Sequence, residues 1–262
     1  MEMFKQLDEP LTDQWTYHAI ADSVLAHSLL RAQPGVDPGR TGVTGISWGG
    51  YLTYIVAGVD PRFKLAVPVY GTAFMGEDST WQRGPLQALG REKAMRWLSL
   101  WDPSQYLVRA RMPMLFVNGT NDRHNWLDSW QKTYRLHTGA HALAFKVRMP
   151  HGHPPAGDPP EITAFADGIL RGGAGLPGID KQGHRGSEAW VDFAATPIVA
   201  KAEIVWTVDR GEWPERRWET APAAVDAKTR RVTANMPADA AVYYFNLYDA
   251  HGLLASSESA ER

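Results

Sequence analysis

Hydrophobic positions in the first two thirds of the chain form short continuous runs that alternate with longer stretches of helical spacing. The short runs, which are typical of buried parallel strands, occupy residues 43–46, 64–70, 112–117 and 143–149. Residues 12–32, 49–58, 126–137 and 160–170 place apolar side chains three and four positions apart, which predicts helices. Because strands alternate with helices, we expect an α/β domain with a parallel sheet in residues 1–172.

The helix predicted over residues 12–32 carries an apolar stripe. Thr12 or Asp13 can cap its N-terminus, and a Pro-Gly pair at residues 34–35 ends it. The stripe consists of Trp15, Ile20, Val24, Leu25, Leu29 and Leu30.

The pattern changes near residue 171. Residues 173–186 are rich in glycine and are predicted to be a linker. Residues 187–262 contain short alternating segments, separated by turn residues, without helical periodicity. They predict a small antiparallel β-sandwich domain of immunoglobulin-like type.

One stretch, TGVTGISWGG at residues 41–50, carries a chemical signal. It contains the pattern Gly-x-Ser-x-Gly around Ser47, placed where a predicted strand ends and a predicted helix begins. Such a turn strains the serine backbone and exposes its hydroxyl, and glycines on both sides avoid clashes. An ordinary turn serine would leave the flanking glycines unexplained.

A serine nucleophile needs a base and an acid, and candidates follow the later strands. Asp122 follows the third predicted strand, while His151 and His153 follow the fourth. The carboxyl ends of parallel strands meet at one edge of a sheet, so these side chains are expected to lie there together. Asp122 could instead serve only as a cap of the next helix. Asp128 and Asp158 are weaker candidates for the acid.

The order Ser, Asp, His and the motifs GISWGG, GTND and MPHGH resemble the α/β-hydrolase superfamily. The resemblance covers about residues 13–173 and is nearest to enzymes similar to prolyl oligopeptidase, dienelactone hydrolase and acetyl xylan esterase. It implies a partial α/β-hydrolase sheet with flanking helices, in which Ser47 attacks an ester carbonyl and Asp122 orients the histidine. A Gly-His pair after the last strand is common in the family, which favours His153 as the base, with His151 as the alternative.

The resemblance also implies an oxyanion hole, in which the backbone N–H of Trp48 would be one donor. Aromatic residues near the motifs, Tyr70 and Trp126 first, with Trp48 and Trp81, are candidates for the substrate pocket. Core packing explains each of them equally well. Arg123 could bind a substrate carboxylate, but a solvated loop arginine is the simpler interpretation.

Only about forty residues precede the nucleophile strand, whereas the family has several strands there. The sequence therefore predicts an N-terminally shortened α/β-hydrolase sheet whose nucleophile strand lies at an edge, with its second oxyanion donor missing. We expect a covering surface, most simply a second copy of the chain in a homodimer or higher homo-oligomer. The helix at residues 12–32 or the β domain could cover the edge instead.

The composition limits the classes of partner and cofactor that the chain is expected to bind. A net charge of −2 argues against nucleic acid, and no apolar run is long enough to span a membrane. The absence of cysteine excludes a thiol nucleophile and disulfides, and no cofactor or metal is expected. The acidic N-terminus is not a secretory signal, so the chain as given is expected to be cytoplasmic, with its location unknown if the N-terminus is truncated.

Three functions are compatible with these patterns. The first is a serine carboxylesterase for short acyl esters, with acetylated carbohydrate as one candidate substrate class. The second is a serine peptidase of the prolyl oligopeptidase kind. The third is a non-catalytic binding or assembly module derived from a hydrolase.

Overall fold

The computed structural model describes residues 2–77 and 79–262. By its internal contacts the chain divides into two compact units. The first comprises residues 1–114 and 123–141, and the second comprises residues 115–122 and 142–262.

A parallel four-stranded sheet with helices around it confirms the predicted α/β class. Its strands are β1 (Gly42–Ile46), β2 (Leu65–Val69), β3 (Met114–Gly119) and β4 (His141–Lys146), in the order β1-β2-β3-β4. The helices are α1 (Trp15–Arg31), α2 (Trp48–Val59), α3 (Gln87–Leu89), α4 (Arg91–Trp101), α5 (Ser104–Leu107), α6 (Leu127–Leu136), α7 (His153–Gly157) and α8 (Pro160–Arg171). Short turns of other helix types are η1 (Glu2–Asp8), η2 (Leu11–Asp13) and η3 (Gln82–Leu86).

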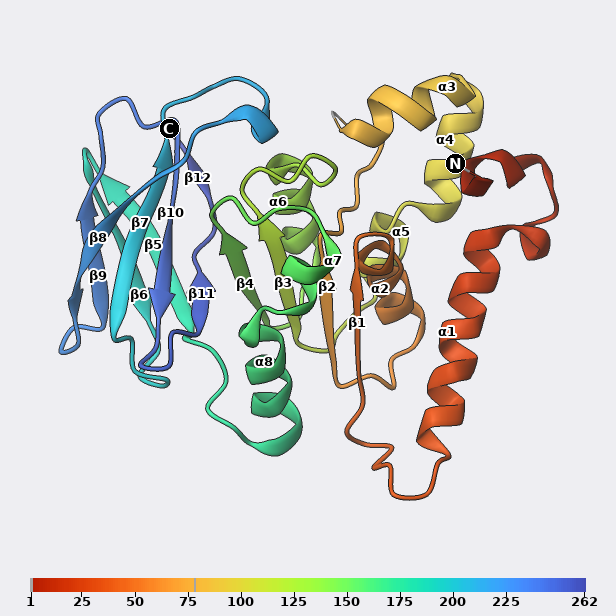
Figure 1. Cartoon of the computed structure of the whole chain (residues 1–262), viewed down its shortest axis with the longest axis horizontal. Coiled ribbons are helices and arrows are strands. Elements are labelled where there is room, and N and C mark those ends of the chain that lie inside the picture. Colours follow the sequence, from red (N-terminus) through yellow and green to blue (C-terminus); the bar gives the residue numbers. More distant parts are fainter. Residues whose placement is uncertain (1, 78) are drawn as a thin grey trace. The chain divides into compact units, whose positions relative to one another are not determined.

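In the first unit, α2 packs on β1 and β2 and is buried along most of its length (Figure 1). Residues of α2, α4 and the N-terminal η1 form one hydrophobic core, with Phe4 and Tyr51 both packed against Trp97. This core lies directly behind the turn that carries Ser47, because Tyr51 is one helical turn beyond it.

Much of the apolar stripe of α1 is exposed. Leu25 and Leu29 are each 66% exposed, whereas Thr16 and His27 are buried on the opposite side of the helix. The physical reason is that the His27 side chain forms hydrogen bonds with the buried Thr41 and Asp60. These bonds allow the helix to bury a polar side chain. Apolar periodicity alone cannot reveal such partners, because they lie elsewhere in the chain.

The antiparallel part of the second unit has strands in the order β11-β10-β7-β8-β9-β6-β5, and β12 pairs with β10 (Figure 1). β8 pairs with β7 through its first half and with β9 through its second half, so the sheet curls there. Alternate residues of β6, β7 and β10 meet in a shared core around Val191, Ile204 and Phe245. The strands are β5 (Ile179–Arg185), β6 (Glu188–Phe193), β7 (Lys201–Thr207), β8 (Glu219–Asp226), β9 (Arg231–Asn235), β10 (Val242–Tyr248), β11 (Leu254–Ser256) and β12 (Ala260–Glu261).

The prediction of a linker at residues 173–186 is corrected by the structure, because the strand β5 occupies Ile179–Arg185 within that range. This edge strand is mostly polar, and a register shift near Ile179 hides the alternation expected of a strand. Gly183 lies under the indole of Trp190, since a Cβ there would be 2.8 Å from that ring. A glycine that looks like a linker residue is therefore required by close packing within the sheet.

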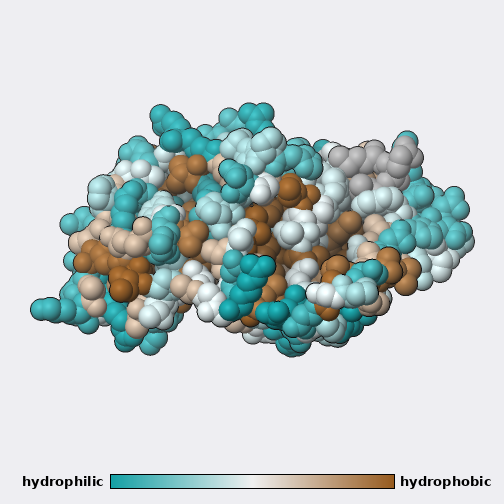
Figure 2. Space-filling model, turned by 60° about the horizontal axis from the view of Figure 1, so that its bottom comes forward, coloured by the Kyte–Doolittle hydropathy of each residue, from teal (hydrophilic) through white to brown (hydrophobic). Residues whose placement is uncertain are grey.

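Within the described residues, no helix is both long and apolar enough to cross a membrane. Figure 2 shows one face of the molecule, on which hydrophobic residues gather in patches between hydrophilic ones.

Candidate active site

Ser47 lies between the last residue of β1 and the first residue of α2, as the glycine pattern predicts. Its backbone has φ 59° and ψ −113°, a region that non-glycine residues rarely adopt. Its N–H donates to the Val69 carbonyl at 2.8 Å, and its own carbonyl accepts from the Tyr51 N–H at 2.9 Å. Backbone strain of this kind persists only where the surroundings fix it, and it is concentrated at functional sites.

The glycines of this serine turn (residues 45–50) allow the backbone to close. A Cβ on Gly45 would lie 2.3 Å from the carbonyl oxygen of Gly49, and a Cβ on Gly50 would lie 2.5 Å from that of Val69. A Cβ on Gly49, in contrast, would meet no atom beyond its own helix within 4 Å. Strand, turn and helix therefore touch through backbone atoms at Gly45 and Gly50.

A small pocket opens beside Ser47 in the first unit. It holds about 210 Å³ of empty space, part of which is open solvent. Half of its lining residues are aromatic. Thr72 and Asn125 add a polar side, where the Thr72 hydroxyl donates to Asn125 Oδ1 at 3.2 Å. The lining residues are Ser47, Trp48, Tyr51, Tyr70, Thr72, Met75, Trp81 and Asn125.

The structure thus brings Trp48, Tyr70 and Trp81 to the pocket with Ser47. Trp126 does not line this pocket: it precedes α6, is 5% exposed, and its indole N–H donates to the Arg123 carbonyl. Its neighbour Asn125 lines the pocket instead. Sequence analysis missed Asn125, although its place just after the GTND motif was a usable signal.

In the second unit, Asp122 and His151 form a close pair. The Nδ1 of His151 lies 2.7 Å from Asp122 Oδ2, the Asp122 side chain is fully buried, and that of His151 is 20% exposed. A carboxylate only accepts hydrogen bonds, so His151 donates from Nδ1 to Asp122 Oδ2.

Asp122 is therefore paired with His151, the residue that the sequence analysis gives as the alternative base. His153, the base favoured by the Gly-His pattern, begins α7 and is exposed. Arg123, the neighbour of Asp122, is exposed as well. Among the described residues, no group of three or more acidic or histidine side chains could hold a metal ion.

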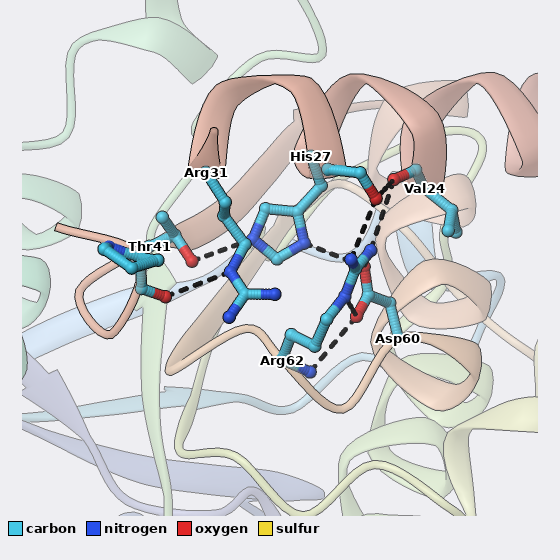
Figure 3. Close-up of polar contacts among 8 residues, drawn as sticks. Val24, His27, Arg31, Thr41, Asp60 and Arg62 are labelled. Atoms are coloured by element: carbon cyan, nitrogen blue, oxygen red, sulfur yellow. Dashed lines mark hydrogen bonds and ion pairs between the residues drawn. The ribbon is translucent and has the colours of Figure 1, made fainter. Parts of the chain in front are cut away.

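A second polar network lies at the far end of the strand and helix that flank Ser47 (Figure 3). His27 Nδ1 lies 2.7 Å from Asp60 Oδ2, and its Nε2 lies 2.8 Å from the Thr41 hydroxyl. Arg62 donates to both oxygens of Asp60 at 2.6 Å. Burial raises the pKa of Asp60, but the bonds from Arg62 and His27 outweigh it and hold the pKa at about 2.

Thr41 precedes β1 and Asp60 follows α2, so His27 ties together the two ends of the segment that contains the serine turn. The arrangement of hydroxyl, imidazole and carboxylate resembles a catalytic set, but all three residues are buried. The network therefore has a structural role, because it links α1 to the start of β1 and to the end of α2.

Several solved structures have a related fold. The acetyl xylan esterases of Thermoanaerobacterium sp. JW/SL YS485 and Paenibacillus sp. R4 match with TM-scores of 0.51 and 0.53, at 18% and 21% sequence identity. They cover 58% and 61% of this chain, and the matched parts are 53% and 54% of their own chains. A puromycin hydrolase matches with a TM-score of 0.52 at 16% identity, over 61% of this chain and 26% of its own.

One curated relative is similar in sequence. The uncharacterized peptidase YuxL of Bacillus subtilis (strain 168) is 32% identical over 105 residues, which are 36% of this chain and 15% of that protein. The chain thus spans about half the length of the esterases and a smaller part of the peptidase.

The decisive comparison is with families. Residues 5–158, more than half of the chain, match the profile of the prolyl oligopeptidase family, and they include Ser47, Asp122 and His151. The resemblance to α/β-hydrolases that the motifs indicate is therefore confirmed, and the chain belongs to the prolyl oligopeptidase family.

Proposed function

We propose that the chain is a serine hydrolase that cleaves short acyl esters through an acyl-enzyme intermediate. The observation that carries this proposal is the strained Ser47 between β1 and α2, next to a small aromatic pocket. A structural turn would not need a serine held at positive φ beside a cavity.

In the proposed reaction, His151 Nε2 takes the proton of the Ser47 hydroxyl as its oxygen attacks the ester carbonyl. Asp122 keeps the His151 Nδ1 proton in place and stabilises the imidazolium that forms. The Trp48 N–H donates to the developing oxyanion. His151 then returns the proton to the leaving alcohol, and a water molecule, activated in the same way, hydrolyses the acyl-enzyme.

The pocket favours a small acyl group. It is lined by large side chains such as Trp48, Tyr51 and Trp81, which leave little room beside Ser47. The likeness to two acetyl xylan esterases supports an acetyl ester, with acetylated carbohydrate as a substrate class.

The second candidate is a peptidase. It is favoured by the family and by the 105-residue similarity to YuxL, which is described as a peptidase. The same Ser47, Asp122 and His151 would then act on an amide bond. The third candidate, a non-catalytic module, predicts no hydrolysis of either bond.

Hydrolysis of p-nitrophenyl acetate and of a peptide p-nitroanilide tests these candidates together. We expect the acetate to be cleaved with the higher kcat/KM. Ser47→Ala and His151→Ala are each expected to lower kcat by about a thousandfold or more, because the nucleophile and its base act as a unit. Preference for the anilide would establish the peptidase instead.

Two controls sharpen the assay. Ser99→Ala changes an exposed serine of α4 whose hydroxyl donates to the Arg96 carbonyl, and it should leave kcat unchanged. His153→Ala distinguishes the two histidines and should retain most activity. Equal loss in both histidine variants would contradict the choice of His151, and activity that survives Ser47→Ala would exclude the mechanism.

A further inference from the structure

The loop that carries Asp122 is held by the antiparallel β domain. Asn121, the residue before Asp122, donates both amide hydrogens to carbonyls of one β-domain segment, that of Pro214 at 2.9 Å and that of Arg216 at 2.7 Å. Its Oδ1 accepts from the Thr120 hydroxyl at 2.7 Å. The side chain thus uses every donor it has, and both donors go to the β domain.

The loop that carries His151 is held by the same segment. Arg148, three residues before His151, donates from its guanidinium to the Trp218 carbonyl, and its backbone N–H donates to the Thr120 hydroxyl at 2.9 Å. Arg148 has φ 52°, so the chain turns sharply here and needs fixed partners to stay in this conformation. The acid and base loops are therefore joined through Thr120 and share one support, residues 213–218.

This support is itself rigid. Trp218 is 1% exposed and packs edge-on against Phe145 of β4 and Tyr244 of β10. The Phe145 N–H donates to the Ser256 hydroxyl at 2.8 Å, and the Tyr244 hydroxyl donates to the Phe145 carbonyl at 3.2 Å. Side chains of the β domain thus satisfy backbone groups of β4, which covers the edge of that strand.

A polar contact supports the other side of β4. Glu161 of α8 is 1% exposed, pairs with Lys146 at 2.9 Å, and accepts from the Leu254 N–H of β11 at 3.2 Å. A carboxylate buried between α8 and β11 is tolerated only where such partners are fixed. The β domain is therefore built into the unit that holds Asp122 and His151, unlike a tethered accessory domain.

We propose that Asn121 and Arg148 are positioning residues, through which the β domain sets the geometry of the Asp122–His151 pair. The proposal rests on the proposed function for its kinetic consequence. The proposal follows from a chain of hydrogen bonds. Carbonyl groups of the β domain hold the side chains of Asn121 and Arg148, and these two residues hold the loops that carry Asp122 and His151. The loops in turn set the distance of 2.7 Å between the acid and the base.

The test uses the full chain with Asn121→Ala and a matched control, Gln182→Ala. Gln182 also donates its amide to a β-domain carbonyl, that of Glu258 at 2.9 Å, but among the described residues its side chain makes no hydrogen bond to either loop. Two readouts are compared: kcat and KM for p-nitrophenyl acetate, and the downfield proton signal of His151 Nδ1–H, which is assigned by its loss in His151→Ala.

We expect Asn121→Ala to lower kcat by about tenfold or more with KM changed by less than about twofold, because misplacement of a catalytic group acts on the transition state. The His151 proton signal should shift or broaden. Gln182→Ala should change neither readout, even if it lowers stability to a similar degree. Arg148→Lys, which keeps the charge but loses the planar donor to Trp218, should act like Asn121→Ala and provides a second variant if that one folds poorly.

An unchanged kcat and proton signal in both Asn121→Ala and Arg148→Lys would overturn the proposal, as would equal changes in Gln182→Ala. The proton signal separates this proposal from the proposed function. If the wild type hydrolyses neither substrate, the function fails, while the response of the His151 signal still decides whether the β domain positions the pair.

Discussion

Gly45 and Gly49 stand at equal distances from Ser47 in sequence, but only Gly45 is required by packing. We expect Gly45→Ala to lower the free energy of unfolding by about 1–3 kcal/mol and to abolish most activity, because the new Cβ would press on the Gly49 carbonyl and force the serine turn apart. Gly49→Ala is the matched control. Its Cβ would meet no atom beyond its own helix within 4 Å, and alanine is favoured over glycine in a helix, so stability should stay equal or rise by about 0.5–1 kcal/mol.

Chemical denaturation and ester hydrolysis measure both effects. The prediction would be wrong if the two alanine variants behaved alike. It would also be wrong if Gly45→Ala kept full activity, because the strained backbone of Ser47 would then not depend on the close contact of strand and helix.

At the scale of single residues, the sequence predicts the candidate site residues that directly follow the ends of strands. Ser47 and Asp122 are predicted in this way, because a Gly-x-Ser-x-Gly turn and a polar residue directly after a buried run are both signals of a site at the end of a strand. The choice between His151 and His153 could not be predicted. β4 ends at Lys146, and the turn at Arg148 has a positive φ that only its partners in the β domain explain, so local spacing does not reveal which imidazole meets Asp122.

At the scale of elements, the His27 network links stability to pH. The pKa of Asp60 lies at about 2 in the folded chain, below its ordinary value of 3.8, and its side chain is 2% exposed. A lowered carboxyl pKa stabilises the folded state at pH values above the unfolded pKa, and this contribution is lost as pH falls through the folded pKa. Asp60 should therefore contribute about 2 kcal/mol above about pH 4, which is lost between about pH 4 and 2.

Urea unfolding of the wild type and of Asp60→Asn between pH 3 and pH 7 measures this contribution. The difference between the two proteins should be largest at pH 7 and shrink toward pH 3. Asp37→Asn is the control, because Asp37 pairs with Arg40 at a site where both are at least half exposed. A difference that does not depend on pH would contradict the assigned charge on Asp60.

Elements are predicted well where burial is uniform along them. The all-buried β2 and β3 match the predicted runs within two or three residues at each end, because parallel strands covered on both faces read as continuous apolar segments. The sequence does not predict β5 and β8, since both carry mixed polar residues and half-exposed side chains. The apolar periodicity of α1 does not reveal which face the helix buries, because the partners of its buried His27 lie elsewhere in the chain.

At the scale of the whole molecule, self-association remains a prediction. β1 lies at one end of the order of the four-stranded sheet, and its sequence GVTGI contains no proline or charge that would protect an edge. In the same unit, α1 exposes Leu25 and Leu29 on successive turns, and each is 66% exposed. Both features favour burial against a second copy of the chain.

We expect the wild type to form dimers or higher oligomers in sedimentation equilibrium, and the double variant Leu25→Gln/Leu29→Gln to weaken association by about tenfold or more, because two large apolar side chains would no longer be removed from water. Unfolding of the monomer should change by less than about 0.5 kcal/mol, since both leucines are mostly exposed within one chain. Ile198→Gln is the control, because Ile198 is 70% exposed but lies in the β domain. A wild type that stays monomeric at high concentration would exclude the dimer, and equal weakening by Ile198→Gln would move the interface away from α1.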